Sequence, residues 1–263
     1  MTTQTHTGFF APDLTVTIDE QGTGRPVLLL HGGGGPQTVA PLAAGLSDQS
    51  DVITPTHPGF ALTPRPDWYD GIDDLAITYL ELLQRRDLRD VLVIGTSIGG
   101  WIAAEMATRE HNRITGAILI DAVGISVEGV DIADFFALNA DELARRTFHN
   151  PSLMPDPTTL PAEAQQMLKA NGVAIAAYAK EPYMHDPKLR RRLKLVQQPV
   201  LTLWGESDHI APLAYGRAYA ESFPNARFEP IPQAGHLPQI EQPDATLAHI
   251  RRFVAEIGPS ASV

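Results

Sequence analysis

One short segment places a serine between two glycines at a spacing that can make the serine a nucleophile. Ser97 stands at the centre of a Gly-x-Ser-x-Gly pattern over residues 95–99, directly after the apolar run 91–94. Such a run is typical of a strand buried on both faces of a parallel sheet, and residues 98–108 have helical spacing. The pattern predicts a strand, a sharp turn and a helix, with the Ser97 hydroxyl exposed at the turn for an outside base to reach.

A candidate base and a candidate acid follow further along the chain. Asp208 comes just after the strand-like run 199–204, and His236 comes after a second predicted strand at residues 226–231. Open α/β sheets place their sites beyond the carboxyl ends of strands, so these side chains are expected to meet. We expect His236 to accept the Ser97 proton and return it to the leaving group, while Asp208 holds the imidazole in the required tautomer.

Attack by a serine on a carbonyl creates an oxyanion, which needs hydrogen-bond donors already in place. The backbone N–H of Ile98, the residue after the nucleophile, is the first predicted donor. The second is expected from the glycine run 32–35, which follows a predicted strand at residues 27–30. Consecutive glycines let backbone amides approach a ligand closely, and Gly33 is the preferred donor with Gly34 as the alternative.

Other titratable residues have weaker claims to chemistry. Asp121 also follows a predicted strand and is the alternative acid, and His31 is expected to fix the glycine loop by hydrogen bonding. The remaining histidines lack metal-ligand spacing, such as two histidines three or four apart on a helix, so no metal is predicted. The glycine run lacks the ending of a phosphate-binding P-loop and the spacing of a dinucleotide fingerprint. We therefore predict that the protein uses no cofactor.

The chain resembles single-domain α/β-hydrolase-fold enzymes with an inserted helical cap, and the likeness extends from Leu14 to Ile257. The residues that carry it are His31-Gly32-Gly33, Gly59, residues 95–100, Asp208 and His236. The order serine, aspartate, histidine along the chain is the order of that fold. The resemblance implies an α/β fold with a mostly parallel eight-stranded sheet flanked by helices. Within this sheet, residues 14–18 alternate apolar and polar as an antiparallel edge strand would.

Strand signals stop between Asp121 and about Arg192, where helical spacing is interrupted by prolines. Helices are expected over residues 132–138, 140–148, 162–170 and 173–179. We predict a core domain of residues 1–122 and 193–263 and an all-helical cap of residues 123–192. A cap over the serine would exclude water and select substrates. The predicted substrate-binding residues are Phe135, Phe136, Phe148 and Leu237, although most apolar cap side chains are expected to pack the cap onto the core.

The leading functional hypothesis is hydrolysis of a small carboxylic ester, lactone or related acyl compound through a Ser97 acyl-enzyme. A serine nucleophile argues against the haloalkane dehalogenases and epoxide hydrolases of this fold, which use aspartate. The first alternative is a carbon–carbon bond hydrolase of meta-cleavage products, since residues 148–151 are similar to the cap of that group. That group usually has Asn before the serine and Trp after the histidine, whereas this chain has Thr96 and Leu237.

Two further alternatives stay open. A hydroxynitrile lyase would need a lysine that reaches the site, and Lys180 and Lys188 are the available sources. A ligand-binding receptor of this fold can also keep an intact set of serine, histidine and aspartate. A receptor would have little turnover and would change the conformation of its cap when the ligand binds.

Length and composition agree with one large enzyme domain. The 263 residues are 43% hydrophobic and 19% charged, enough apolar content for a substantial core. The net charge of −11 without a basic patch argues against a nucleic-acid partner, and the lack of cysteine excludes disulfide chemistry. No signal-like start and no apolar stretch of roughly 20 residues are present. We expect a cytoplasmic monomer or homodimer that acts on a small apolar ester-like molecule, without a membrane partner.

Overall fold

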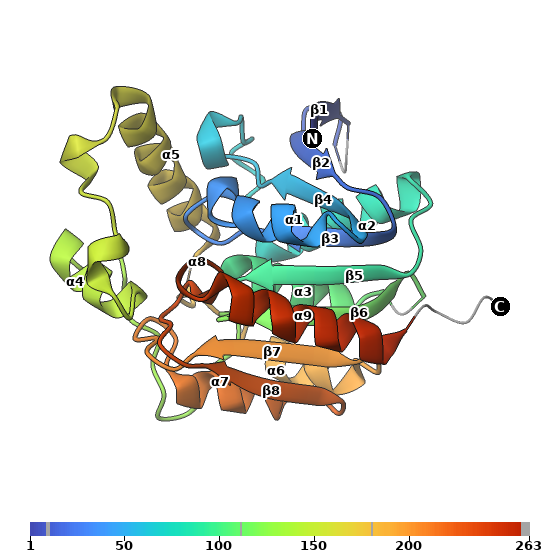
Figure 1. The fold of residues 1–263 in the computed structure, drawn as a ribbon. Helices are drawn as coiled ribbons and strands as arrows, with labels where there is room; N and C mark the ends of the chain where they lie inside the picture. The colour runs from blue at the N-terminus through green and yellow to red at the C-terminus, as the bar shows by residue number, and fades with distance from the viewer. Residues whose placement is uncertain (9–10, 111, 180, 259–263) are drawn as a thin grey trace.

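One eight-stranded sheet forms the centre of the molecule in this computed structural model, which describes residues 1–8, 11–110, 112–179 and 181–258 (Figure 1). The strands are β1 (Thr2–Thr7), β2 (Thr15–Gln21), β3 (Arg25–Leu30), β4 (Ser50–Thr56), β5 (Val91–Thr96), β6 (Ile114–Ile120), β7 (Val200–Gly205) and β8 (Ala226–Ile231). Their spatial order is β1-β2-β4-β3-β5-β6-β7-β8. β2 pairs antiparallel with β1 and β4, and all other neighbours are parallel. The predicted mostly parallel eight-stranded sheet is confirmed.

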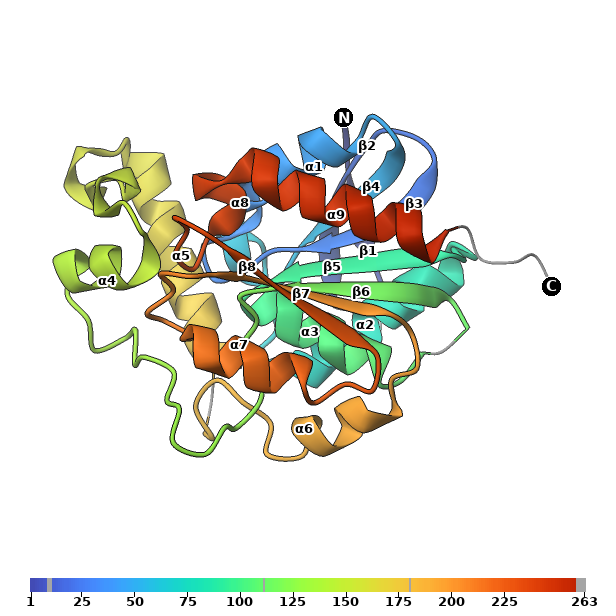
Figure 2. The same cartoon turned by 60° about the horizontal axis from the view of Figure 1, so that its bottom comes forward.

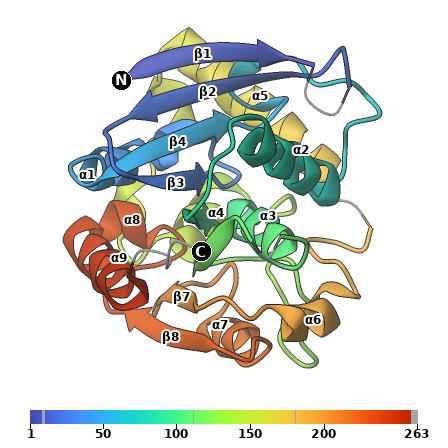
Figure 3. The same cartoon turned by 90° about the vertical axis from the view of Figure 1, so that its right-hand side faces the viewer.

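Helices cover both faces of this sheet, as Figures 2 and 3 show. One face carries α1 (Ala40–Leu46), α8 (Pro238–Glu241) and α9 (Pro243–Ile257); the other carries α2 (Ile72–Arg85), α3 (Ile98–Ala107) and α7 (Leu213–Ala220). The central strands are apolar on both sides because each side is packed. In β3, Leu28 and Leu30 join the hydrophobic cluster on one face, whereas Val27 and Leu29 join the cluster on the other, as alternating side chains of a strand must.

The described residues between β6 and β7 form no strand of the sheet, and they include three further helices. These are α4 (Ala140–Thr147), α5 (Ala162–Tyr178) and α6 (Leu189–Arg192), with short 3-10 turns at Pro151–Leu153, Pro157–Thr159 and Leu193–Leu195. Figure 1 shows α4 and α5 beyond the end of the sheet toward which the arrows of β5 and β7 point. In Figure 2, α6 lies apart from them, near α7 and the body of the core. The domain boundaries at residues 123 and 192 stay a prediction.

The helix expected over residues 132–138 is wrong, because the structure has no helix between β6 and α4. Backbone groups here bond mostly to distant segments, and a single local turn bond joins the N–H of Ala137 to the carbonyl of Asp134. The N–H of Ala133 donates to the carbonyl of Ile210, and the N–H of Phe135 donates to the Tyr183 hydroxyl. The Tyr183 hydroxyl in turn donates to the carbonyl of Ala133. By contrast, the two helices expected over 162–170 and 173–179 form the single helix α5.

The edge of the sheet also differs from the expectation. The strand predicted near residues 14–18 is β2, but it lies inside the sheet because β1 pairs along its outer side. β1 consists of the polar residues Thr2–Thr7 and is mostly exposed. Its threonines have high strand propensity, and an edge strand needs no apolar face of its own. Among the described residues, every helix is too short or too polar to cross a lipid bilayer.

Candidate active site

Ser97 lies in the tight turn between β5 and α3, and its backbone is strained. Its φ of 53° and ψ of −117° place a non-glycine residue at positive φ, which costs energy and persists only where the surroundings enforce it. The flanking glycines allow this turn. A Cβ on Gly95 would lie 2.1 Å from the carbonyl oxygen of Gly99, and one on Gly99 would lie 2.3 Å from that of Leu30. Strand and helix therefore pack too closely for any side chain at these two positions.

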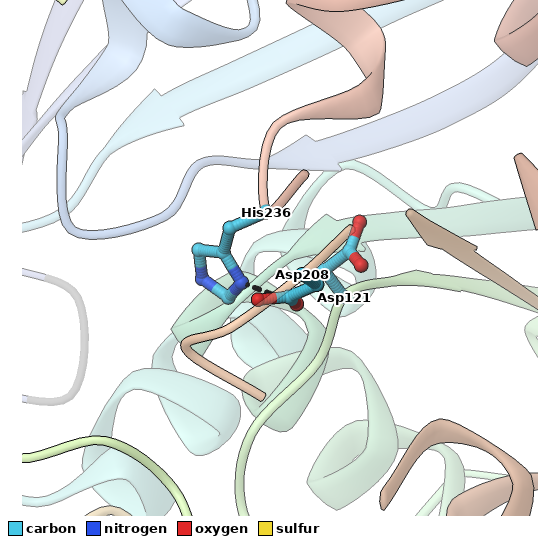
Figure 4. Close-up of side chains that lie close together, drawn as sticks. All are labelled: Asp121, Asp208 and His236. Carbon is cyan, nitrogen blue, oxygen red and sulfur yellow. Dashed lines mark hydrogen bonds and ion pairs between the residues drawn. The ribbon is translucent and has the colours of Figure 1, made fainter. Parts of the chain in front are cut away.

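The structure brings Ser97, His236 and Asp208 together from the ends of β5, β8 and β7. The His236 Nε2 atom is 3.0 Å from Ser97 Oγ. The Nδ1 atom of the same ring is 2.8 Å from Asp208 Oδ2, as the dashed line in Figure 4 marks. Asp208 Oδ1 accepts the backbone N–H groups of Ile210 and Ala211. Since a carboxylate only accepts, Nδ1 carries the imidazole proton and Nε2 is left to accept the serine proton. Ser97 is 9% exposed, His236 8% and Asp208 2%.

Asp121, the alternative acid, lies beside this group but is not bonded to the imidazole. One of its oxygens accepts the backbone N–H of Gly205 at 2.9 Å. Burial and the neighbouring charge of Asp208 raise the pKa of Asp121 well above its usual range. The site could hold a metal ion by its spacing, because three possible ligand atoms lie within 4.8 Å of one another, one each from Asp121, Asp208 and His236. A cation bound there would have to replace the Asp208–His236 hydrogen bond.

The glycine loop passes directly beside Ser97. A Cβ on Gly32 would lie 3.1 Å from the Cβ of Ser97, and one on Gly33 would lie 2.3 Å from Cδ1 of Ile175. Gly34 is turned toward Thr38, since its Cβ would approach that side chain. On the other side, Ile98 is the first residue of α3, where backbone N–H groups lack intrahelical partners and the helix dipole is positive. The donor roles of Gly33, Gly34 and Ile98 stay predictions.

Two buried histidines, His31 and His57, hold the start of the glycine loop through hydrogen bonds. His31 Nε2 accepts the backbone N–H of His57, so its Nδ1 donates to the carbonyl of Gly32 at 2.8 Å. His57 Nε2 donates to the carbonyl of His31, and its Nδ1 accepts the hydroxyl proton of Tyr79. Both rings satisfy their hydrogen bonds while neutral. Burial lowers the pKa of His31 to about 4 and also lowers the pKa of His57, so neither ring is charged at neutral pH.

The four predicted substrate-binding residues fall into two places. Phe148 is buried at the end of α4, where its Cα would lie 2.9 Å from a Cβ on Gly235, and the half-buried Leu237 directly follows His236. The rings of Phe135 and Phe136 instead pack on each other with centroids 4.1 Å apart, and Phe136 also contacts Tyr183. Phe136 is 45% exposed. Lys188, the lyase candidate, is exposed, and Lys180 lies outside the described residues.

Sequence reasoning missed the residues of α5 that contact the glycine loop. The buried Asn171 on α5 donates its Nδ2 to the Gly34 carbonyl, while its Oδ1 accepts the N–H of Ala61. Ile175, one turn later, covers Gly33. The signal was present in the sequence: the buried positions of α5 are Asn171, Ala174, Ile175 and Tyr178, a helical stripe with one polar member. A polar residue on such a stripe needs a hydrogen-bonding partner elsewhere in the fold.

The sequence and the fold of this chain are both similar to those of known proteins. The sequence model of a family described as "Alpha/beta hydrolase family" matches residues 27–249. The chain belongs to this alpha/beta hydrolase family. It is 27% identical to a 2-hydroxymuconate semialdehyde hydrolase of Pseudomonas putida, over 91% of this chain and 90% of that protein. It is 25% identical to Lipase 3 of a Moraxella species, over 88% of this chain and 78% of the lipase.

Among solved structures, a thermophilic esterase from Thermogutta terrifontis is similar at a TM-score of 0.79 and 25% identity. The match covers 98% of this chain and 99% of the esterase. Membership in the alpha/beta hydrolase family together with these relatives supports a hydrolase. The relatives differ among themselves in substrate, so they leave the substrate of this hydrolase open.

Proposed function

We propose that this alpha/beta hydrolase is a serine hydrolase that cleaves a small carboxylic ester, lactone or related acyl compound. The observation that carries the proposal is the chain of hydrogen bonds from Ser97 Oγ through His236 to Asp208, at 3.0 and 2.8 Å. It begins at a strained turn that presents the serine at the end of β5. A hydroxyl in this arrangement has the nearby base that an ordinary serine lacks.

In the proposed reaction, His236 Nε2 takes the Ser97 proton as Oγ attacks the substrate carbonyl. The N–H groups of Ile98 and Gly33 stabilise the oxyanion that forms. His236 then gives its proton to the leaving alcohol, which departs and leaves the acyl group on Ser97. A water molecule, deprotonated by His236, attacks this ester, and His236 returns the proton to Ser97 Oγ as the acyl–oxygen bond breaks and the acid is released. Asp208 stabilises the imidazolium in both halves of the reaction without itself taking the proton.

The surroundings of the serine favour a small apolar substrate. Ser97 and His236 are nearly buried, and the apolar side chains of Ile175, Phe148 and Leu237 lie beside the glycine loop and the His236 loop. Apolar walls with a few placed polar groups are the usual character of a small-molecule site. Such burial also excludes water, which strengthens the hydrogen bonds to the oxyanion.

Carbon–carbon bond hydrolysis is the second candidate, and its support is the relative named as a 2-hydroxymuconate semialdehyde hydrolase. That reaction would use the same serine, histidine and aspartate. The residues that flank the site argue for the ester, since Thr96 and Leu237 stand where the carbon–carbon hydrolases usually have Asn and Trp.

A fluorophosphonate probe tests the nucleophile directly. We expect mass spectrometry to locate the adduct on Ser97, and we expect Ser97→Ala and His236→Ala to prevent labelling while both variants keep the unfolding temperature of the wild type. Turnover of p-nitrophenyl esters of short acids and of 2-hydroxymuconate semialdehyde by the wild type then separates the two reactions. Labelling on another residue, or ester turnover retained by Ser97→Ala, would overturn the proposal.

A further inference from the structure

A second carboxyl group lies beside Asp208, the proposed acid that orients His236. The proposed reaction does not use this second group. Asp121 follows β6 with a φ of 45° and is 0% exposed. Its Oδ1 accepts the N–H of Gly205, whereas its Oδ2 is buried without a donor among the described residues. A buried carboxylate oxygen with no donor is costly, so this atom needs an explanation.

The neighbour of Asp121 is the carboxyl group of Asp208: one oxygen of each, together with one ring nitrogen of His236, lie within 4.8 Å of one another. Two buried carboxylates this close would repel each other and could not hydrogen-bond, because both would only accept, so a proton on one of the two relieves the contact. Asp208 already accepts three donors, from Ile210, Ala211 and His236. Asp121 accepts one. The donors therefore compensate the charge of Asp208 and leave the proton to Asp121.

We propose that Asp121 is a positioning residue that stays protonated at neutral pH and donates its O–H to the carboxylate of Asp208. The pair then carries one negative charge, and Asp208 has a fourth donor that fixes the direction of its carboxylate toward His236. This inference rests on the proposed function, because it assigns Asp208 the role of the acid that orients His236. Figure 4 shows the three side chains gathered at one place.

The charged groups around Asp121 agree with a neutral side chain. Asp208 lies beside Asp121, in the loop after β7. His236 is hydrogen-bonded to Asp208, and Glu241, in α8, is a third charged group that acts on Asp121. Burial, then the charge of Asp208 and, to a smaller extent, that of Glu241 raise the pKa of Asp121. Glu241 is itself occupied, since its carboxylate accepts backbone N–H groups that include that of Gly235. The two acidic neighbours, Asp208 and Glu241, offer Asp121 no positive charge.

Substitution of Asp121 by asparagine and by alanine tests the role of its proton. Asparagine has nearly the same shape as a protonated aspartate and can donate to Asp208 while accepting from Gly205. We expect Asp121→Asn to keep ester kcat/KM within about threefold and to leave the acidic limb of its pH profile unmoved, whereas Asp121→Ala loses about tenfold. If Asp121 were ionised, Asp121→Asn would remove a negative charge near His236 and move that limb to lower pH. Such a shift, or an asparagine variant as impaired as the alanine variant, would overturn the inference.

A measurement without turnover separates this inference from the proposed function. The infrared C=O stretch of a protonated buried carboxylic acid is expected at neutral pH in Ser97→Ala, and it should vanish in Ser97→Ala/Asp121→Asn. Absence of the band in the first variant, or its persistence in the second, would overturn the protonated Asp121 whatever the activity. If the band behaves as expected but the wild type neither reacts with the fluorophosphonate nor hydrolyses esters, the proton assignment stands and the proposed function fails.

Discussion

The two loops that flank Ser97 are held in place by different kinds of interaction. The loop that carries His236 is held largely through its own backbone. The N–H of His236 donates to the carbonyl of Thr147 in the cap at 2.6 Å, and the N–H of Ser207 in the Asp208 loop donates to the carbonyl of Ala234 at 2.8 Å. The carboxylate of Glu241 adds one side-chain acceptor, for the N–H of Gly235.

The glycine loop, by contrast, is held by side chains from three parts of the chain. The His31 ring bonds to the Gly32 carbonyl, Asn171 of the cap bonds to the Gly34 carbonyl, and the Thr38 hydroxyl bonds to the Gly35 carbonyl. A glycine loop has no side chains of its own with which to pack, so the groups around it determine its conformation.

This difference tells us what each loop depends on. Backbone bonds tolerate changes of side chain but require close approach, so the His236 loop depends on glycines. The glycine loop depends on the identity and protonation of His31 and on the position of α5. The segment between β6 and β7 therefore contacts both sides of the proposed site: through the backbone of Thr147 on one side and through the side chains of Asn171 and Ile175 on the other.

The largest effect is expected from Gly235→Ala. A Cβ on Gly235 would lie 2.3 Å from the carbonyl oxygen of Thr147 and 2.9 Å from the Cα of Phe148. Both contacts are with backbone, so the His236 loop and the cap must separate. We expect kcat for ester hydrolysis to fall by about a hundredfold, because small misplacements of a reacting group are costly, and the unfolding temperature to fall as well.

The matched control for that change is Gly172→Ala in α5, where a new Cβ would meet nothing within 4 Å. This cap variant should keep full activity and gain roughly 0.5–1 kcal/mol of stability from helix propensity. If Gly235→Ala were as active as Gly172→Ala, backbone packing would not be what holds the His236 loop.

The next effect is a dependence of stability on pH that comes from His31, beneath the glycine loop. The pKa of His31 is lowered by burial from 6.5 to about 4, so between these values the unfolded chain binds a proton that the folded chain does not. Stability is therefore lost as pH falls through this window, and His31 alone should cost about 2 kcal/mol between about pH 7 and pH 5. His57 acts in the same direction, and the raised pKa of Asp121 acts in the opposite one.

Urea unfolding of the wild type and of His31→Gln at these two pH values isolates the contribution of His31. The contribution of Asp121 is present in both proteins, and the His31 ring is one cause of the lowered pKa of His57, so we expect the loss of stability on acidification to be smaller in the variant by at least about 2 kcal/mol. An equal loss in the two proteins would show that the His31 ring is not held neutral beneath the glycine loop.

The smallest effect is expected from Asn171→Ala. This variant loses the hydrogen bonds to the Gly34 carbonyl and the Ala61 N–H, which together should cost about 1–2 kcal/mol. We expect ester kcat/KM to fall by about five- to tenfold, because the glycine loop is then held less firmly. The control is Gln166→Ala, an exposed substitution on the same helix, which should leave both kcat/KM and stability unchanged. Equal activity of the two variants would mean that α5 does not hold the loop.

Local sequence was sufficient to predict much of the fold. Strands and helices of the core alternate with clear apolar periodicity, and the tight turn at Ser97 needs glycines at set positions next to it. The failures have a common physical cause. Residues 132–138 have helical spacing, but their backbone bonds to Ile210 and Tyr183. β1 forms from polar residues because β2 offers it a free edge.

The sequence by itself determined which residues could act, since a serine in a glycine turn, an aspartate and a histidine each follow a strand in the order of this fold. Only the tertiary structure decided what surrounds them. Asn171 is far from Gly34 along the chain, and Asp121 is far from Asp208, yet the members of each pair lie close together in the fold. Periodicity reports the burial of a residue but not its partner, and hydrogen bonds and pKa values depend on the partner.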